Sequence, residues 1–221
     1  MAEQKMDEME KVNEAISSSE KFLVNNQKTI IYVLVAIIAV IAIVLGVKQF
    51  YLEPREVKAQ EALFRPVLAF EQDSLDLALN GNEEFDGLLA VVDNYGSTKA
   101  GNLAAAYAGL AYYEKADFEN AKAYLSKFSA DEAILAPAIT AAIGNALVNM
   151  DNIAEAAKYF EKAAKVADNK VYSPLYLMKA ANVYEKLGDK AAALKVYETI
   201  KNDYPTSQQA ATIDSYIERV K

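Results

Sequence analysis

The chain has 221 residues, a formal net charge of −8, and neither histidine nor cysteine. It therefore lacks the usual general base, the thiol nucleophile and the standard ligands of zinc and copper sites, so we expect no metal, no cofactor and no enzymatic activity. No Walker-type loop, G-x-G-x-x-G loop or G-x-S-x-G elbow is present. Because acidic proteins repel phosphate backbones, nucleic acid is not an expected ligand.

The first segment, residues 1–28, carries four lysines and six acidic residues, a net charge of −2. This is unlike the short basic region that opens a cleaved signal peptide. A thin apolar stripe predicts a partly ordered surface helix in this arm. A partner-binding role for the arm is an alternative that the sequence leaves open.

Residues 29–47 are nineteen uncharged residues between Lys28 and Lys48, and thirteen of them are Ile, Leu or Val. As a helix they span about 28 Å, close to the hydrocarbon thickness of a bilayer. A helix buried in a soluble protein would carry a polar stripe, and this one has none. No A-x-A-like cleavage site follows. We expect residues 29–52 to form an uncleaved transmembrane signal anchor, with Phe50 and Tyr51 at the membrane interface.

Small residues recur on one face of this span, at Ala39, Ala42 and Gly46. This spacing predicts a packing face for another transmembrane helix, although alanine is common in such spans. The basic residues on the two sides of the span nearly balance, so charge alone does not set the orientation.

Three short helices are expected after the span. Pro54 fits the first turn of a new helix, whose helical pattern runs over residues 56–70 and which Pro66 should kink or break. The second covers 74–79 and ends at the turn Asn80-Gly81-Asn82. The third covers 83–94 and stops at Tyr95-Gly96-Ser97. We interpret residues 53–101 as a degenerate N-terminal repeat or cap.

The rest of the chain is periodic. Ala121, Ala156 and Ala193 are 35 and 37 residues apart. Residues of similar type recur at fixed offsets from them: small residues twelve before (Gly109, Gly144, Ala181), large residues nine before (Tyr112, Leu147, Tyr184) and large residues four after (Leu125, Phe160, Tyr197).

This pattern resembles the tetratricopeptide repeat, in which small residues let two antiparallel helices approach closely. It predicts an all-α fold: a single N-terminal transmembrane helix followed by a tetratricopeptide-repeat-like α-solenoid. Residues 102–221 would hold three repeats, with residues 207–220 as a C-terminal capping helix. The alternative is a generic alanine-rich helical bundle.

In tetratricopeptide arrays the first helix of each repeat lines a concave groove. The resemblance therefore implies a protein-binding groove that is apolar and rich in amides, suited to an extended or partly unfolded chain. Its predicted residues are Tyr113, Asn145, Asn149, Met178, Asn182 and Lys186. Only Lys179 matches the basic positions of a carboxylate clamp, so a clamp is not expected. For any single groove residue, plain packing is the alternative.

The layout of arm, span, degenerate helical pair and repeats resembles the YfgM-like family, the ancillary membrane-anchored tetratricopeptide subunits of the bacterial Sec translocon. The resemblance implies a single-pass inner-membrane protein with a cytoplasmic N-terminus and a periplasmic C-terminal domain. Its expected partners are the lipid bilayer, membrane translocon subunits, and a periplasmic chaperone or secreted client polypeptides. The alternatives are a scaffold for a division, secretion or outer-membrane assembly complex and, third, a hydrolase of unfamiliar type.

Overall fold

The computed structural model describes residues 25–129 and 134–221, so the surface helix expected in the N-terminal arm lies outside the described residues. The chain divides into two compact units, residues 1–54 and 55–221, and each is taken by itself. The regular secondary structure of the described residues is helical apart from an isolated bridge between Gly81 and Asp86, and turns and loops join the helices.

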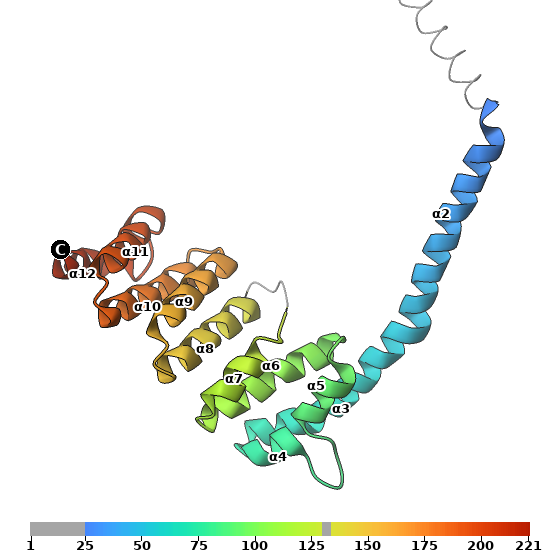
Figure 1. The fold of residues 1–221 in the computed structure, drawn as a ribbon, viewed down its shortest axis with the longest axis horizontal. Helices are drawn as coiled ribbons and strands as arrows, with labels where there is room; N and C mark the ends of the chain where they lie inside the picture. The colour runs from blue at the N-terminus through green and yellow to red at the C-terminus, as the bar shows by residue number, and fades with distance from the viewer. Residues whose placement is uncertain (1–24, 130–133) are drawn as a thin grey trace, which may run out of the picture. The chain divides into compact units, whose positions relative to one another are not determined.

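The described part of the first unit is one long apolar helix, α2 (Gln27–Val47), coloured blue in Figure 1. It contains the apolar run of residues 29–47, and none of its residues is buried. By length and composition this helix is a candidate for a single membrane span.

The backbone changes helix type after α2. Residues Lys48–Leu52 form a π-helix, η1, and the Glu53 N–H bonds to the Lys48 carbonyl five residues back. Pro54 explains the change, because it has no N–H to donate and its ring crowds the carbonyl four residues before it. Helical structure then continues to Glu71. An α-helix with Pro54 in its first turn is therefore present, as predicted, but it continues from η1 without a break.

The second unit begins within α3 (Glu53–Glu71), which runs through Pro66. The break expected at Pro66 does not occur, and the proline is buried in the helix instead. The next helix, α4 (Leu75–Asn80), follows the prediction closely and ends at Gly81, whose φ is 71°.

The next helix, α5 (Leu88–Tyr95), starts later than predicted. The Asn82 side-chain oxygen accepts hydrogen bonds from the backbone N–H groups of Glu84 (2.9 Å) and Phe85 (3.2 Å). These bonds form a turn, and the Asn82 N–H donates back to the Phe85 carbonyl at 3.0 Å, which occupies the acceptor that a helix through residue 85 would use.

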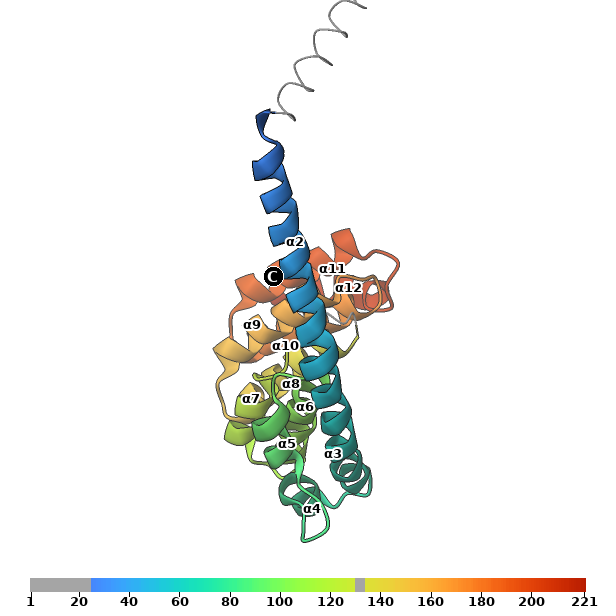
Figure 2. The same cartoon turned by 90° about the vertical axis from the view of Figure 1, so that its right-hand side faces the viewer.

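Three antiparallel helix pairs follow, stacked side by side as Figures 1 and 2 show. They are α6 (Lys99–Glu114) with α7 (Phe118–Leu125), α8 (Leu135–Asn149) with α9 (Ile153–Ala167), and α10 (Tyr172–Leu187) with α11 (Lys190–Asp203). The predicted closing helix is shorter than expected. It consists of a 3₁₀ turn, η2 (Ala210–Thr212), and α12 (Ile213–Val220).

The turns within the three pairs are the same. Each has one residue with positive φ, at Ala116 (59°), Asp151 (57°) and Gly188 (80°). The next N–H in each turn bonds to a carbonyl five residues back, the bond that ends a helix in a Schellman motif. The repeated alanine at the start of each second helix is fully buried.

The α3–α4 turn repeats this geometry a fourth time. Asp73 has a φ of 58°, and the Ser74 N–H bonds to the Ala69 carbonyl at 2.9 Å. Ala78 takes the place of the repeated alanine and is fully buried. The sequence hides this relationship because α5 and its loop widen the spacing from Ala78 to Ala121 to 43 residues.

The small residues of the repeat permit the close approach within pairs. A Cβ added to Gly109 would lie 2.5 Å from Leu125 Cγ, and one added to Gly144 would lie 2.9 Å from Phe160 Cε1. Buried side chains form two clusters, one over α3 to α6 and the other over α7 to α12, and α6 contributes to both. These clusters hold the first helices of successive pairs in the register that builds the site below.

Candidate functional site

A cavity of about 320 Å³ opens on the side of the array formed by the first helices of the pairs. We call it the amide groove, after three asparagines in its lining. Its lining residues come from α6, α8, α9 and α10: Tyr113, Asn145, Val148, Asn149, Phe160, Lys179, Asn182 and Val183. Three consecutive helix pairs therefore contribute to one cavity.

Hydrogen bonds within the groove join neighbouring pairs. The Asn149 side-chain amide donates to the Tyr113 hydroxyl at 3.2 Å and to the Asn145 carbonyl at 3.0 Å. The Lys179 ammonium lies 3.5 Å from the Asn145 side-chain oxygen. Asn149 is exposed and Asn145 half-buried, so their remaining hydrogen-bonding capacity faces the cavity and solvent.

Lys179 is the charged residue among those that line the groove. Its ammonium lies 5.6 Å from the centre of the Phe160 ring, within the range of a cation–π contact. This contact holds the positive charge over an aromatic wall. The groove therefore favours carbonyl or carboxylate oxygen at this point.

The structure brings together four of the six residues predicted for the groove: Tyr113, Asn145, Asn149 and Asn182. Met178 is half-buried and packs against the core, and Lys186 is exposed away from the lining.

Sequence reasoning missed Lys179 and Phe160 as groove residues. Lys179 lies three residues before Asn182 on the same face of α10, which is a signal that the sequence offers. Phe160 belongs to a second helix, so the repeat pattern assigned it to packing alone.

Asn182 connects the groove to a polar cluster near the C-terminus. Its side-chain oxygen accepts a 3.2 Å hydrogen bond from the Tyr197 hydroxyl. The single proton of that hydroxyl is shared with the Glu185 carboxylate, the closer acceptor at 2.5 Å, and Arg219 on α12 donates to the same carboxylate at 2.7 Å. These contacts fix the α10 wall of the groove against α11 and α12.

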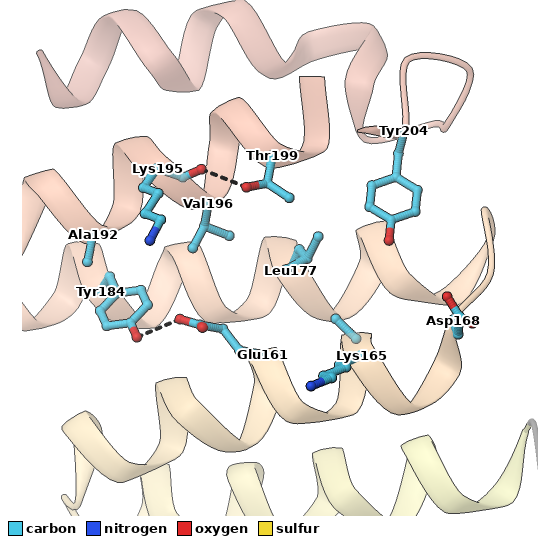
Figure 3. Close-up of a pocket in the computed structure, with 11 residues that line it drawn as sticks. Glu161, Lys165, Asp168, Leu177, Tyr184, Ala192, Lys195, Val196, Thr199 and Tyr204 are labelled. Atoms are coloured by element: carbon cyan, nitrogen blue, oxygen red, sulfur yellow. Dashed lines mark hydrogen bonds between the residues drawn. The ribbon is translucent and has the colours of Figure 1, made fainter. Parts of the chain in front are cut away.

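A larger cavity, of about 580 Å³, lies between the second helices α9 and α11, as Figure 3 shows. Its lining residues are Glu161, Ala164, Lys165, Asp168, Leu177, Tyr184, Ala192, Lys195, Val196, Thr199 and Tyr204. Asn182 in the amide groove and Tyr184 here are two residues apart on α10, about 200° around the helix. The two cavities therefore lie on opposite sides of α10.

Tyr184 and Glu161 interact across this second cavity. The Tyr184 hydroxyl donates a 2.6 Å hydrogen bond to Glu161 (Figure 3). Burial, together with this hydrogen bond and the carboxylate charge, raises the pKa of Tyr184 to about 12. Sequence reasoning missed this cavity because it placed the binding surface on the first helices, whereas most of this lining comes from the second helices α9 and α11.

The small residues predicted as a packing face in the span have no partner among the described residues. Ala39 and Ala42 are exposed on α2, and a Cβ added to Gly46 would meet nothing within 4 Å. Within residues 25–129 and 134–221, no three carboxylates gather closely enough to hold a metal ion.

Comparison with known families agrees with the repeat geometry. Residues 141–170 and 176–207 each match a family model described as a tetratricopeptide repeat. These matches cover most of the α8–α9 and α10–α11 pairs. No curated protein matches the chain. Such repeats are generally non-enzymatic protein-interaction scaffolds. The chain therefore has an all-α fold with tetratricopeptide repeats over residues 141–170 and 176–207, and it carries one candidate membrane span.

Proposed function

We propose that the chain is a membrane-anchored protein-interaction module whose amide groove binds an extended polypeptide. The observation that carries this proposal is the convergence of Tyr113, Asn145, Asn149 and Asn182 on one cavity. Each asparagine side chain offers both a donor and an acceptor, as a peptide backbone does. Main-chain pairing of this kind depends little on the sequence of the bound segment, which suits a module for partly unfolded chains.

The cellular setting follows from the resemblance to the YfgM-like family. In the proposed arrangement, residues 1–28 are a cytoplasmic arm, 29–52 cross the bacterial inner membrane, and 53–221 lie in the periplasm. Within the periplasmic part, 53–101 are a degenerate repeat or cap, and 102–221 hold three repeats and the capping helix. The module is an ancillary subunit of the Sec translocon that meets emerging chains or a periplasmic chaperone.

The membrane anchor keeps the amide groove close to the chains that it is proposed to bind. A span beside the translocon raises the effective concentration of the groove near each emerging chain, so weak and reversible contacts are sufficient. The small face formed by Ala39, Ala42 and Gly46 would pack against a translocon helix, because small residues let transmembrane helices approach closely.

Affinity purification of the full chain in mild detergent tests the setting. We expect the channel-forming translocon subunits to co-purify. A variant with leucine at Ala39, Ala42 and Gly46 should lose them, while a matched variant with leucine at Val33, Val40 and Val44, on the opposite face of the helix, should retain them. Recovery of division or outer-membrane assembly proteins in place of the translocon would contradict the proposal and support the envelope-scaffold alternative.

A further inference from the structure

The outward face of α3 carries a stripe that is apolar except for one glutamate. We call it the α3 seam, and its residues are Val57, Glu61, Phe64 and Leu68. These residues are spaced by four, three and four, the pattern of a coiled-coil seam. At about 100° per residue they lie within roughly 60° of one another. Ala59, Leu63 and Pro66 on the other side of α3 are buried. The seam therefore faces away from the packed array.

The apolar side chains of the seam are open to solvent. Val57 is 54% exposed, Phe64 69% and Leu68 42%. Phe64 has one of the most exposed apolar side chains of the second unit, among the described residues. Exposed apolar side chains at heptad spacing on one helix are typical of a surface that receives another helix.

The C-terminal end of the array, formed by α12, has a polar outer face. On α12, Ile213, Ile217 and Val220 are buried, while Asp214 and Glu218 face solvent. Terminal helices of a solenoid need a polar outer face for solubility. The end formed by α12 meets that requirement and the end formed by α3 does not, so the α3 seam has the character of an interface.

The charges on α3 indicate what kind of surface fits. Glu61 interrupts the apolar seam, and its carboxylate makes no ion pair within the described residues. A parallel second copy would place Glu61 against the same carboxylate. An antiparallel copy that pairs Val57 with Leu68 would place Glu61 against Phe64. In both arrangements a second copy would bury the Glu61 carboxylate without placing a cation beside it, which is unfavourable. A second copy of the chain therefore fits the seam poorly.

A lipid surface fits the seam no better. The exposed ionic residues of α3 beyond the first turn, Lys58, Glu61, Arg65 and Glu71, balance in charge. Helices that bind anionic membrane surfaces carry an excess of Lys and Arg on their polar face. Arg65 is also engaged, since it pairs with Glu84 at 3.0 Å.

We propose that the α3 seam docks an amphipathic helix of a different protein, which presents apolar residues at heptad spacing and one Lys or Arg facing Glu61. The cation would neutralise the carboxylate as the contact excludes water. This surface is separate from the amide groove, so it is tested independently of the proposed function.

A charge-swap experiment on the full chain in nanodiscs of zwitterionic lipid tests the pairing. The probes are two fluorescent helical peptides of three heptads with leucine at positions a and d. In one peptide a lysine replaces the a-position leucine that faces Glu61, and in the other a glutamate does. We expect the lysine peptide to bind at least tenfold more tightly, and Glu61→Lys to reverse that preference. Equal affinity of the two peptides, no binding, or equal binding to empty nanodiscs would overturn the proposal.

Matched substitutions locate the contact. Phe64→Ser should weaken binding of the lysine peptide at least tenfold. Val171→Ser, at a side chain that is also 69% exposed, should leave binding unchanged. Equal effects of the two substitutions would contradict a site at the seam. Sedimentation should show one copy of the chain per nanodisc, and self-association that is lost in Phe64→Ser would instead identify a second copy as the occupant.

Cross-linking in cells addresses the natural partner. A photo-crosslinker at Phe64 should attach to a peptide of another protein that contains a basic residue within an apolar heptad. Attachment to lipid, to a second copy, or to a segment without a basic residue would contradict the proposed partner.

Discussion

The hydroxyl of Tyr197 on α11 donates a 2.5 Å hydrogen bond to the Glu185 carboxylate on α10, although the Tyr197 side chain is fully buried. The ring centre of Tyr197 lies 5.4 Å from that of Tyr216 on α12, and Arg219 binds the same carboxylate. One carboxylate therefore ties the last three helices together.

The first prediction concerns pH. Burial opposes ionisation of Glu185, but hydrogen bonds from Arg219 and Tyr197 prevail and lower the pKa of its carboxyl below the usual value. A lowered pKa stabilises the fold above the pKa of the unfolded chain, and this stability is lost as pH falls through the folded pKa. We expect amide hydrogen exchange in α12 to accelerate in acid once intrinsic rates are corrected. In Glu185→Gln, α12 should show a smaller acceleration, and an equal acceleration would contradict this role.

Removing the Tyr197 hydroxyl tests the same cluster without a titration. Tyr197→Phe loses hydrogen bonds to Glu185 and Asn182 and keeps the ring contacts. Because bonds to charged groups contribute most, we expect a loss of about 1 to 3 kcal/mol in the free energy of unfolding. Chemical denaturation in detergent measures it. Tyr204→Phe is the control and should change the free energy by less than Tyr197→Phe does.

Close packing within the helix pairs predicts that alanine destabilises the fold by different amounts at Gly109 and Gly144. A Cβ at Gly109 would lie 2.7 Å from the Leu125 backbone nitrogen, whereas the atoms nearest to one at Gly144 are side-chain atoms of the Phe160 ring. A ring can move more easily than backbone. We expect Gly109→Ala to destabilise the fold by about 1 to 3 kcal/mol and Gly144→Ala by less. The reverse order in thermal unfolding would show that the pairs are not packed as described.

The repeated turns predict two changes of opposite sign. Ala116 and Gly188 occupy equivalent positions with φ of 59° and 80°. A left-handed backbone costs an ordinary residue roughly 1 to 2 kcal/mol, part of which is offset by the greater freedom of glycine in the unfolded chain. We expect Ala116→Gly to raise the melting temperature and Gly188→Ala to lower it. Changes of the same sign would contradict the equivalence of these turns.

Much of the fold was predictable from local pattern. The span is evident from its uninterrupted apolar run, and the repeats from the glycines and alanines that close helix packing requires. The α3–α4 turn was not recognised, because a loop and α5 interrupt the spacing after it. The start of α5 was also misplaced, because the Asn82 N–H bonds back to the Phe85 carbonyl and Gly81 pairs with Asp86, so the chain turns where a helix was expected.

The amide groove was partly predictable for a similar reason. Asn145, Asn149 and Asn182 follow the repeat register, which a sequence displays directly. Lys179 and Phe160 meet across two helix pairs, and the cavity between α9 and α11 depends on how far those helices stand apart. Such distances follow from packing of the whole array, which no local pattern encodes.

Photo-crosslinking from the groove tests the central claim most directly. A photo-crosslinker replaces Asn149 in the membrane-anchored full chain during synthesis of a secreted protein. The control replaces Tyr159, which lies outside the groove lining on α9. We predict cross-links to the emerging chain from position 149, none from 159, and their loss when Asn145 and Asn182 are both changed to leucine. Equal labelling from the two positions, or no cross-link from 149, would contradict a groove that binds extended polypeptides.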